Sequence, residues 1–295
     1  RDIGGWNVSM VTDMSSMFNG ARRFNKDIDR WNVSGVRDMS SMFQTAVSFN
    51  YNIGSWNVSS VTNMSHMFKG AVSFNKDIGR WNVSSVTDMT NMFDGTGLTP
   101  DISLNIWQSW SSVSSINNTN ARAIGQVMNS LNIIDLSGLY EDPSFNIDIG
   151  NWDVSAVTEM SRMFNGAESF DQDISGWNIS SLQIATNMFD GTGLSYDNSF
   201  NIWQNWSSVS SINATNAKAI GQVMNSLNII DLSGLYEDPS FNIDIGIWDV
   251  SMVTDMSRMF NGAESFNQDI SGWNVSMVTD MSRMFNGARI FNQDI

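Results

Sequence analysis

The chain has no cysteine and only one histidine, His66, among its 295 residues. Disulfide scaffolds, thiolate zinc sites and iron–sulfur clusters all require cysteine, so the sequence excludes them. A nucleophile activated by a histidine could depend only on His66. The sequence therefore offers little material for redox, metal-thiolate or triad chemistry.

Basic residues are also scarce. The chain carries 15 Lys and Arg against 30 Asp and Glu, which gives a formal net charge of −15. Proteins that bind nucleic acid need a basic surface to displace counterions, and docking on anionic lipid needs a basic patch as well. No apolar run reaches the length of a membrane span, and no secretory signal pattern opens the sequence. We expect neither nucleic-acid binding nor membrane insertion.

Tryptophan, in contrast, recurs at a fixed interval of 25 residues. Such a period is the signature of a repeat array, in which each unit buries its apolar face against its neighbours. The unit reads approximately F-N-x-D-I-x-x-W-N-V-S-x-V-T-D-M-S-x-M-F-N-G-A, and eight copies are clear. The tryptophans that mark them are Trp6, Trp31, Trp56, Trp81, Trp152, Trp177, Trp248 and Trp273.

A longer period of 96 residues lies over the short one, because Trp81, Trp177 and Trp273 are 96 residues apart. Each long step contains an insertion, and the inserted blocks 94–143 and 190–239 differ at only seven of fifty positions, such as Pro100/Tyr196 and Arg122/Lys218. We predict one continuous solenoid over 1–295, with regular repeats at 1–93, 145–189 and 241–295 and insertions at 94–144 and 190–240.

Each repeat shows a short strand pattern followed by a helical stripe. Ile28, Trp31 and Val33 are β-branched or aromatic, with Trp31 and Val33 on one face, which is typical of a short strand. Apolar residues between 36 and 43 follow a helical spacing, and a Gly such as Gly20 ends the unit in a left-handed turn. The expected fold is an α/β solenoid, a leucine-rich-repeat-like stack of 25-residue strand–turn–short-helix coils with two duplicated irregular insertions. Within the insertion, residues 120–131 predict an amphipathic helix.

The run of residues 266–285, FNQDISGWNVSMVTDMSRMF, resembles the repeat of BspA-like leucine-rich-repeat surface proteins, which is familiar from mycoplasma lipoproteins. The similarity extends over the eight regular copies and not over the insertions. It implies an extracellular, cell-surface solenoid, adhesive or of unassigned role, and it brings no catalytic residues.

An acidic column lies four residues before the tryptophans. Stacked carboxylates about 4.8 Å apart would repel by about 0.9 kcal/mol in water, so a partner must offset the charge. One explanation is an Asx turn, in which backbone N–H groups bind the carboxylate, and the Asn at position 52 fits it. The alternative is calcium bridging successive coils. The candidate calcium ligands are Asp27, Asp77, Asp148, Asp173, Asp244 and Asp269.

The column directly after each tryptophan is Asn in six copies, and each of these begins a formal N-glycosylation sequon. Asp replaces Asn at positions 153 and 249, so the column needs an acceptor oxygen, and this favours a hydrogen-bonded turn. If the protein is glycosylated, we expect glycans in the irregular coils, at Asn117, Asn205 or Asn213.

The insertions supply the candidate contact surface. Their aromatic residues are typical anchors of protein interfaces, although they could equally close the core. The predicted function is an extracellular structural or adhesive repeat protein without catalysis, a segment or subunit of a surface fibre. The alternative is a glycan- or matrix-binding surface module that uses the same aromatics. The candidate interface residues are Trp107, Trp110, Tyr140, Trp203, Trp206 and Tyr236.

The sequence starts and stops at the same phase of the repeat, at Asp2 and Asp294. A solenoid cut there presents open coil edges without a polar capping repeat. We expect a longer chain or end-to-end self-association of copies through their terminal coils, which would generate a filament. Surface proteins or glycans are the other expected partners.

Overall fold

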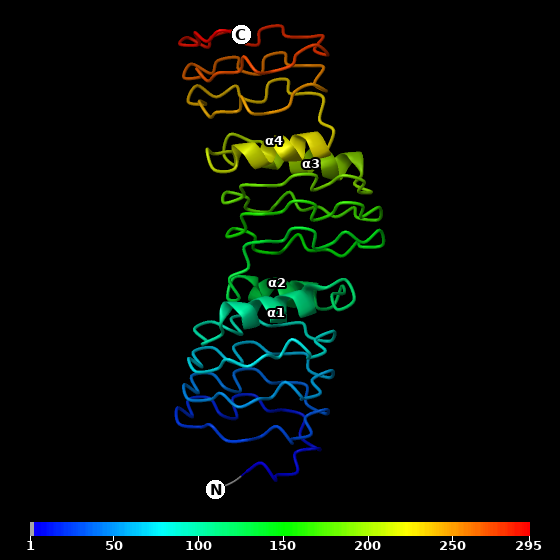
Figure 1. Ribbon diagram of the computed structural model, residues 1–295, viewed down its shortest axis with the longest axis vertical. Coiled ribbons are helices and arrows are strands. Elements are labelled where there is room, and N and C mark those ends of the chain that lie inside the picture. The colour runs from blue at the N-terminus through cyan, green and yellow to red at the C-terminus, as the bar shows by residue number, and fades with distance from the viewer. Residues whose placement is uncertain (1–2) are drawn as a thin grey trace. The chain divides into compact units, whose positions relative to one another are not determined.

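The computed structural model describes residues 3–295 (Figure 1); Asp2 lies outside this range. The chain forms two compact units. One contains the residues up to Ile133 together with Ile147–Asp153, and the other contains Ile134–Asn146 and Val154–Ile295. The helices of the described residues are α1 (Pro100–Ser111) and α2 (Ala121–Met128) in the first unit, and α3 (Tyr196–Trp206) and α4 (Ala217–Ser226) in the second.

The regular repeats contain neither the expected strand nor the expected helix. Throughout residues 3–295 they consist of turns and irregular backbone, with isolated parallel bridges in place of a sheet. The prediction of an α/β solenoid built from strand–turn–helix coils is therefore wrong. The apolar pattern was recognised correctly, but it belongs to a succession of tight turns.

Turn hydrogen bonds replace the predicted strand at residues 28–33. The N–H of Trp31 donates to the Ile28 carbonyl at 3.2 Å, and the N–H of Val36 donates to the Val33 carbonyl at 2.9 Å. A bond between residues three apart closes a β-turn, so the backbone cannot remain extended across it. The chain changes direction twice within nine residues.

A left-handed residue interrupts the predicted helix at 36–43. Ser41 has a φ of 55°, and the equivalent positions in other repeats, such as His66 and Arg258, have φ values of 58° and 60°. Non-glycine residues visit this region singly and do not continue a helix through it. The column that bears these residues, ten positions after each tryptophan, varies in sequence and is exposed or half-buried. Gly20 is left-handed as well, with a φ of 73°.

Backbone hydrogen bonds join each coil to the next within a unit. The N–H groups of Met39, Ser41 and Phe43 donate to carbonyls of the following coil at 2.9, 2.8 and 2.8 Å. Donors at alternate residues indicate a parallel alignment of the two segments. The bridges Asp13–Asp38, Asp38–Asn63 and Asn63–Asp88 mark the same register through successive repeats.

Columns of identical apolar side chains form the core. Equivalent rings of successive repeats stack, with 5.6 Å between the centroids of Phe43 and Phe68 and 6.4 Å between those of Trp56 and Trp81. Buried tryptophans of the regular column also donate from Nε1 to backbone carbonyls; Trp56, for example, donates to the Ile28 carbonyl at 3.1 Å. The tryptophan, methionine and phenylalanine columns form this core, since most of their side chains are buried.

Candidate functional site

The insertions contribute the helices of the described residues. α1 packs against α2, and α3 packs against α4 (Figure 1). The expected helix at 120–131 is confirmed as α2, whereas α1 and α3 were missed. A signal for α1 was present: a proline at its N-terminus, followed by buried positions 103, 106, 107 and 110 at helical spacing.

The six predicted interface residues lie in the core. Trp107 packs edge-on against Trp152 at 5.5 Å, and Tyr236 stacks on Phe241 at 3.8 Å. These side chains continue the ring columns of the repeats, so the structure does not support a contact surface at them. The exposed fractions are 2% for Trp107, 1% for Trp110, 0% for Tyr140, 4% for Trp203, 1% for Trp206 and 0% for Tyr236.

Two other aromatic residues of the second insertion are exposed. Tyr196 and Phe200 expose 78% and 41% of their surface, and their rings stack at 5.8 Å with 13° between the planes. They lie four residues apart on α3, on the same helix face. The first insertion has Pro100 and Leu104 at these positions, so an exposed aromatic pair exists in one copy only.

Hydrogen bonds fix the start of α3, and three of them end on one carboxylate oxygen of Asp171. Its Oδ1 accepts from the N–H of Ser195, from the Ser195 hydroxyl and from the Asn198 amide, each at 2.8 Å. The bonds from the Ser195 N–H and the Asn198 amide hold the pKa of the Asp171 carboxyl below its ordinary value. The Ser195 hydroxyl also accepts from the Asn198 N–H at 3.4 Å, which caps the helix.

The first insertion has a simpler start. Asn75 takes the place of Asp171 and accepts from the N–H of Thr99 at 3.0 Å, and the Thr99 side chain makes no capping hydrogen bond. Asp171 is also unusual among the repeats, because the other regular repeats carry Asn at the equivalent position. The combination of the Asp171 carboxylate, from the preceding regular repeat, with its donors Ser195 and Asn198 therefore occurs only at the second insertion.

A polar hollow lies beside each helix pair. In the second insertion it measures about 450 Å³ and in the first about 330 Å³. Residues with hydroxyl and amide side chains and one aspartate line both copies, together with Phe189 or Phe93. The polar residues of the larger hollow are Asp190, Thr192, Ser199, Asn225, Ser226 and Asn228.

The acidic column forms Asx turns. Each Oδ1 accepts the backbone N–H two residues later, as in Asp77 with Gly79 at 2.8 Å, and Asn52 makes the same bond with Gly54 at 3.0 Å. No three His, Asp or Glu side chains within residues 3–295 come together as a metal-binding group. The same bond occurs at the other calcium candidates, Asp27, Asp148, Asp173, Asp244 and Asp269, at 2.9–3.1 Å.

These turns predict that stability does not depend on calcium. Purified protein treated with a chelator should keep its melting temperature, because backbone N–H groups already compensate the carboxylates. Differential scanning calorimetry with and without added calcium measures this. A decrease of several degrees on chelation would instead show that calcium bridges the coils.

The three glycosylation candidates occupy different environments. The amide nitrogens of Asn117 and Asn213 donate to the carbonyls of Ser84 and Ser180, both at 3.2 Å. Asn205 lies on α3 and donates to the Asn201 carbonyl at 2.9 Å. Glycan attachment at these residues stays a prediction, as does end-to-end association of copies.

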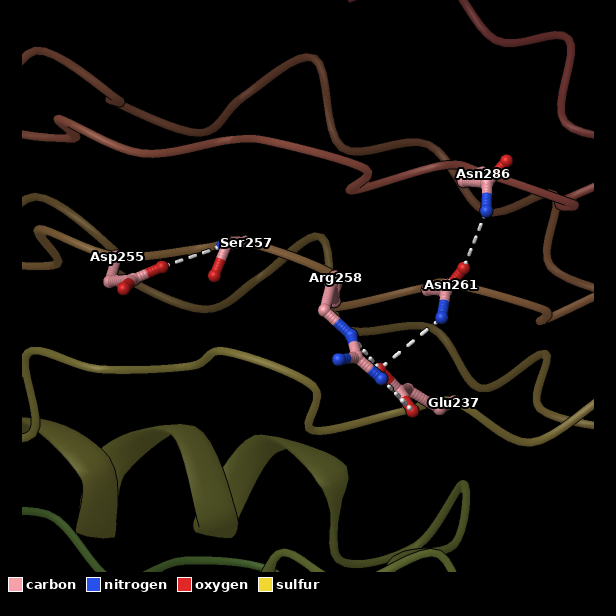
Figure 2. Close-up of polar contacts among 6 residues, drawn as sticks. All are labelled: Glu237, Asp255, Ser257, Arg258, Asn261 and Asn286. Atoms are coloured by element: carbon pink, nitrogen blue, oxygen red, sulfur yellow. Dashed lines mark hydrogen bonds and ion pairs between the residues drawn. The ribbon is translucent and has the colours of Figure 1, made fainter.

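Arg258, one of the residues with a left-handed backbone described above, forms an ion pair with Glu237 at the end of the second insertion (Figure 2). Nε of Arg258 lies 2.8 Å from Oε1 of Glu237, and this contact lowers the pKa of the Glu237 carboxyl. Asn261 donates to the same carboxylate at 3.4 Å, and Asn286 of the next repeat donates to Asn261 at 2.9 Å. His66 belongs to the same left-handed column as Arg258, and its ring lies 3.2 Å from the Asn91 amide. These contacts link neighbouring coils.

Comparison with known proteins gives one family. The family model described as "Mycoplasma protein of unknown function, DUF285" matches three successive regions, residues 1–107, 108–226 and 207–295. No curated protein and no solved structure matches the chain significantly. The tandem organisation inferred from the tryptophan spacing is therefore confirmed. Within the described residues, no helix is both long and apolar enough to cross a membrane.

Proposed function

The chain belongs to the DUF285 family of mycoplasma proteins, and on that premise we propose that it is a non-catalytic repeat protein of the cell surface. Its coils serve as a scaffold, and its two insertions are the elements that contact a partner. The resemblance of the regular repeats to BspA-like surface proteins supports the same placement.

The observation that carries this proposal is the use of polar side chains inside the repeats. Carboxylates that could serve as acids, bases or ligands accept backbone N–H groups two residues later, in one coil after another. The recurring Asp and Asn side chains of a coil thus stabilise its turns. A second polar column does the same, since Asp38 accepts from Ser40 at 2.7 Å and Asp255 from Ser257 at 2.7 Å. An array of this kind is suited to support and display.

The insertions differ from the coils in a way that fits a contact role. They interrupt the array twice, each with a pair of packed helices and a polar hollow. Exposed side chains on such elements can change without disturbing the turns of the repeats.

The surface placement predicts that protease reaches the protein on intact cells. Cells of the source organism are treated with trypsin, and the chain is followed with an antibody beside a cytosolic control protein. We expect the repeat protein to disappear while the control remains. Survival of the chain until the cells are lysed would contradict the surface placement.

A further inference from the structure

We propose that the second insertion contains a binding site for a neutral saccharide, formed by the stacked rings of Tyr196 and Phe200 and the adjoining polar hollow. The proposal deepens the proposed function, because it names the chemistry that one insertion would bind. It depends on contacts of the second unit alone.

The rings and the hollow border one another. Ser199 lines the hollow, lies three residues after Tyr196 in α3 and directly precedes Phe200. Positions three apart share a helix face, so Tyr196 lies beside Ser199 at the edge of the hollow, and the Phe200 ring stacks on Tyr196. The site therefore combines an apolar platform with a polar cleft, the combination expected for a ligand with one apolar face and several hydroxyls.

Differences between the two copies concentrate at this place. The inserted blocks differ at seven positions, and four of these lie at the start of the first helix. They change Thr99, Pro100, Ile102 and Leu104 of the first copy into Ser195, Tyr196, Asn198 and Phe200 of the second. Asp171, which replaces the usual Asn, completes the set. Two changes expose rings, and the other three form the hydrogen bonds that hold the start of their helix.

This hydrogen-bonded set makes the site preorganised. Three donors converge on the Asp171 Oδ1 at 2.8 Å, and hydrogen bonds to a charged acceptor are stronger than those between neutral groups. Tyr196 is the first residue of α3, so these bonds also fix the backbone that carries its ring. Backbone that is already ordered in the free protein loses less conformational entropy when a ligand binds. If the exposed rings bound no ligand, the helix would not need the additional hydrogen bonds on Asp171 at its start.

Charge and geometry select the class of ligand. The charged residues of segment 189–204 are Asp190 and Asp197, both acidic, so acidic saccharides and phosphate-bearing ligands are repelled. A quaternary ammonium site requires rings that enclose the cation, whereas these two rings are nearly parallel. A protein partner would need about 800 Å² on each side, far more than two side chains offer. A neutral sugar can place its C–H face on a ring and its hydroxyls against the amides and hydroxyls of the hollow.

The test uses the purified full chain on an array of neutral, acidic and amino-sugar oligosaccharides, followed by calorimetry with the best neutral saccharide. We expect binding with about one site per chain. The double variant Tyr196→Ala with Phe200→Ala should weaken it by about tenfold or more, because both stacking surfaces are lost. Leu104→Ala, at the position in the first copy that matches Phe200, is the control and should leave the affinity unchanged. Both variants should stay folded with at most a small decrease in melting temperature, since these side chains are at least two-fifths exposed.

A graft into the first copy adds a gain-of-function arm. Asn75→Asp, Thr99→Ser, Pro100→Tyr, Ile102→Asn and Leu104→Phe together recreate the second site, and calorimetry should then count about two sites per chain in place of one. Absence of binding to neutral saccharides, preference for acidic or cationic ligands, or full affinity in the double alanine variant would each overturn the proposal. Failure here would not touch the surface placement, which the trypsin experiment on cells decides by itself.

Discussion

Replacing Trp56 by Ala should destabilise the protein by about 3–5 kcal/mol, the cost of emptying a large buried aromatic site. Trp56 exposes 4% of its surface and stacks on the ring of Trp81 at 6.4 Å. Its Nε1 donates to the Ile28 carbonyl of the preceding coil at 3.1 Å. The substitution therefore removes packing and leaves a buried carbonyl without this donor, two losses that act in the same direction.

The control is Trp6→Ala, in the same column of the repeat. Trp6 exposes 55% of its surface and stacks on Trp31 alone among the aromatic rings. Its loss should cost about 1 kcal/mol or less, since most of its surface is already in contact with water. Chemical denaturation of both variants gives the comparison. Equal costs for the two substitutions would show that the column does not bury its rings as the structure has it.

Replacing Gly221 by Ala should also destabilise the protein, although alanine is the better helix former. Gly221 lies within α4, and a Cβ there would approach Cδ1 of Trp248 to 2.5 Å. The ring cannot move away freely, because its Nε1 donates to the Ala217 carbonyl at 2.8 Å. Overpacking costs about 1–3 kcal/mol and the strained hydrogen bond about 1 more, against a gain of about 1 from helix propensity. The net loss is expected at about 1–3 kcal/mol.

Gly272→Ala provides the comparison for this substitution. A Cβ at Gly272 would meet nothing within 4 Å, so the change should alter the free energy of unfolding by about 0.5 kcal/mol at most. Thermal unfolding of both variants decides the outcome. If Gly221→Ala is as stable as the wild type, close approach of the helix to the Trp248 ring is not required for packing.

Recurrence along the chain predicts which residues are buried and which hold turns. The apolar columns and the acceptor oxygens of the acidic column follow from residue types that return at fixed positions. The insertion helix was recognisable because Ile124, Val127 and Met128 share one face. An Asx turn needs only an acceptor oxygen and a nearby backbone N–H, so the residue type alone is enough to propose one.

Backbone conformation could not be predicted in the same way. Spacings of three and four residues mark one face of a helix, but turns closed every three residues bury Met39, Met42 and Phe43 equally well. The decisive left-handed residue is Ser41 in one repeat and Arg258 in another, neither of which favours that conformation. The residue types found in this column therefore do not predict the left-handed conformation.

Aromatic content was a poor guide to the candidate site for a related reason. Trp107 and Trp203 continue the buried ring columns, and composition does not distinguish such positions from exposed ones. The informative signal was the difference between the two copies. The difference between Pro100 and Tyr196 is visible in the sequence. The hydrogen bonds that converge on Asp171 join residues 24 to 27 positions apart, so they depend on the folded backbone.

The coil-to-coil bonds have a consequence for folding kinetics. Carbonyls that accept from Met39 and Ser41 lie 24 residues further along the chain, and the same separation recurs from Arg162 to Thr186 and from Met256 to Asp280. Every new regular coil therefore closes a loop of the same modest size, at the same entropic cost. Contact order stays low relative to chain length, and folding can begin at any repeat and spread to its neighbours. Repeats can be gained or lost in whole units without lengthening the slowest loop that the chain must close.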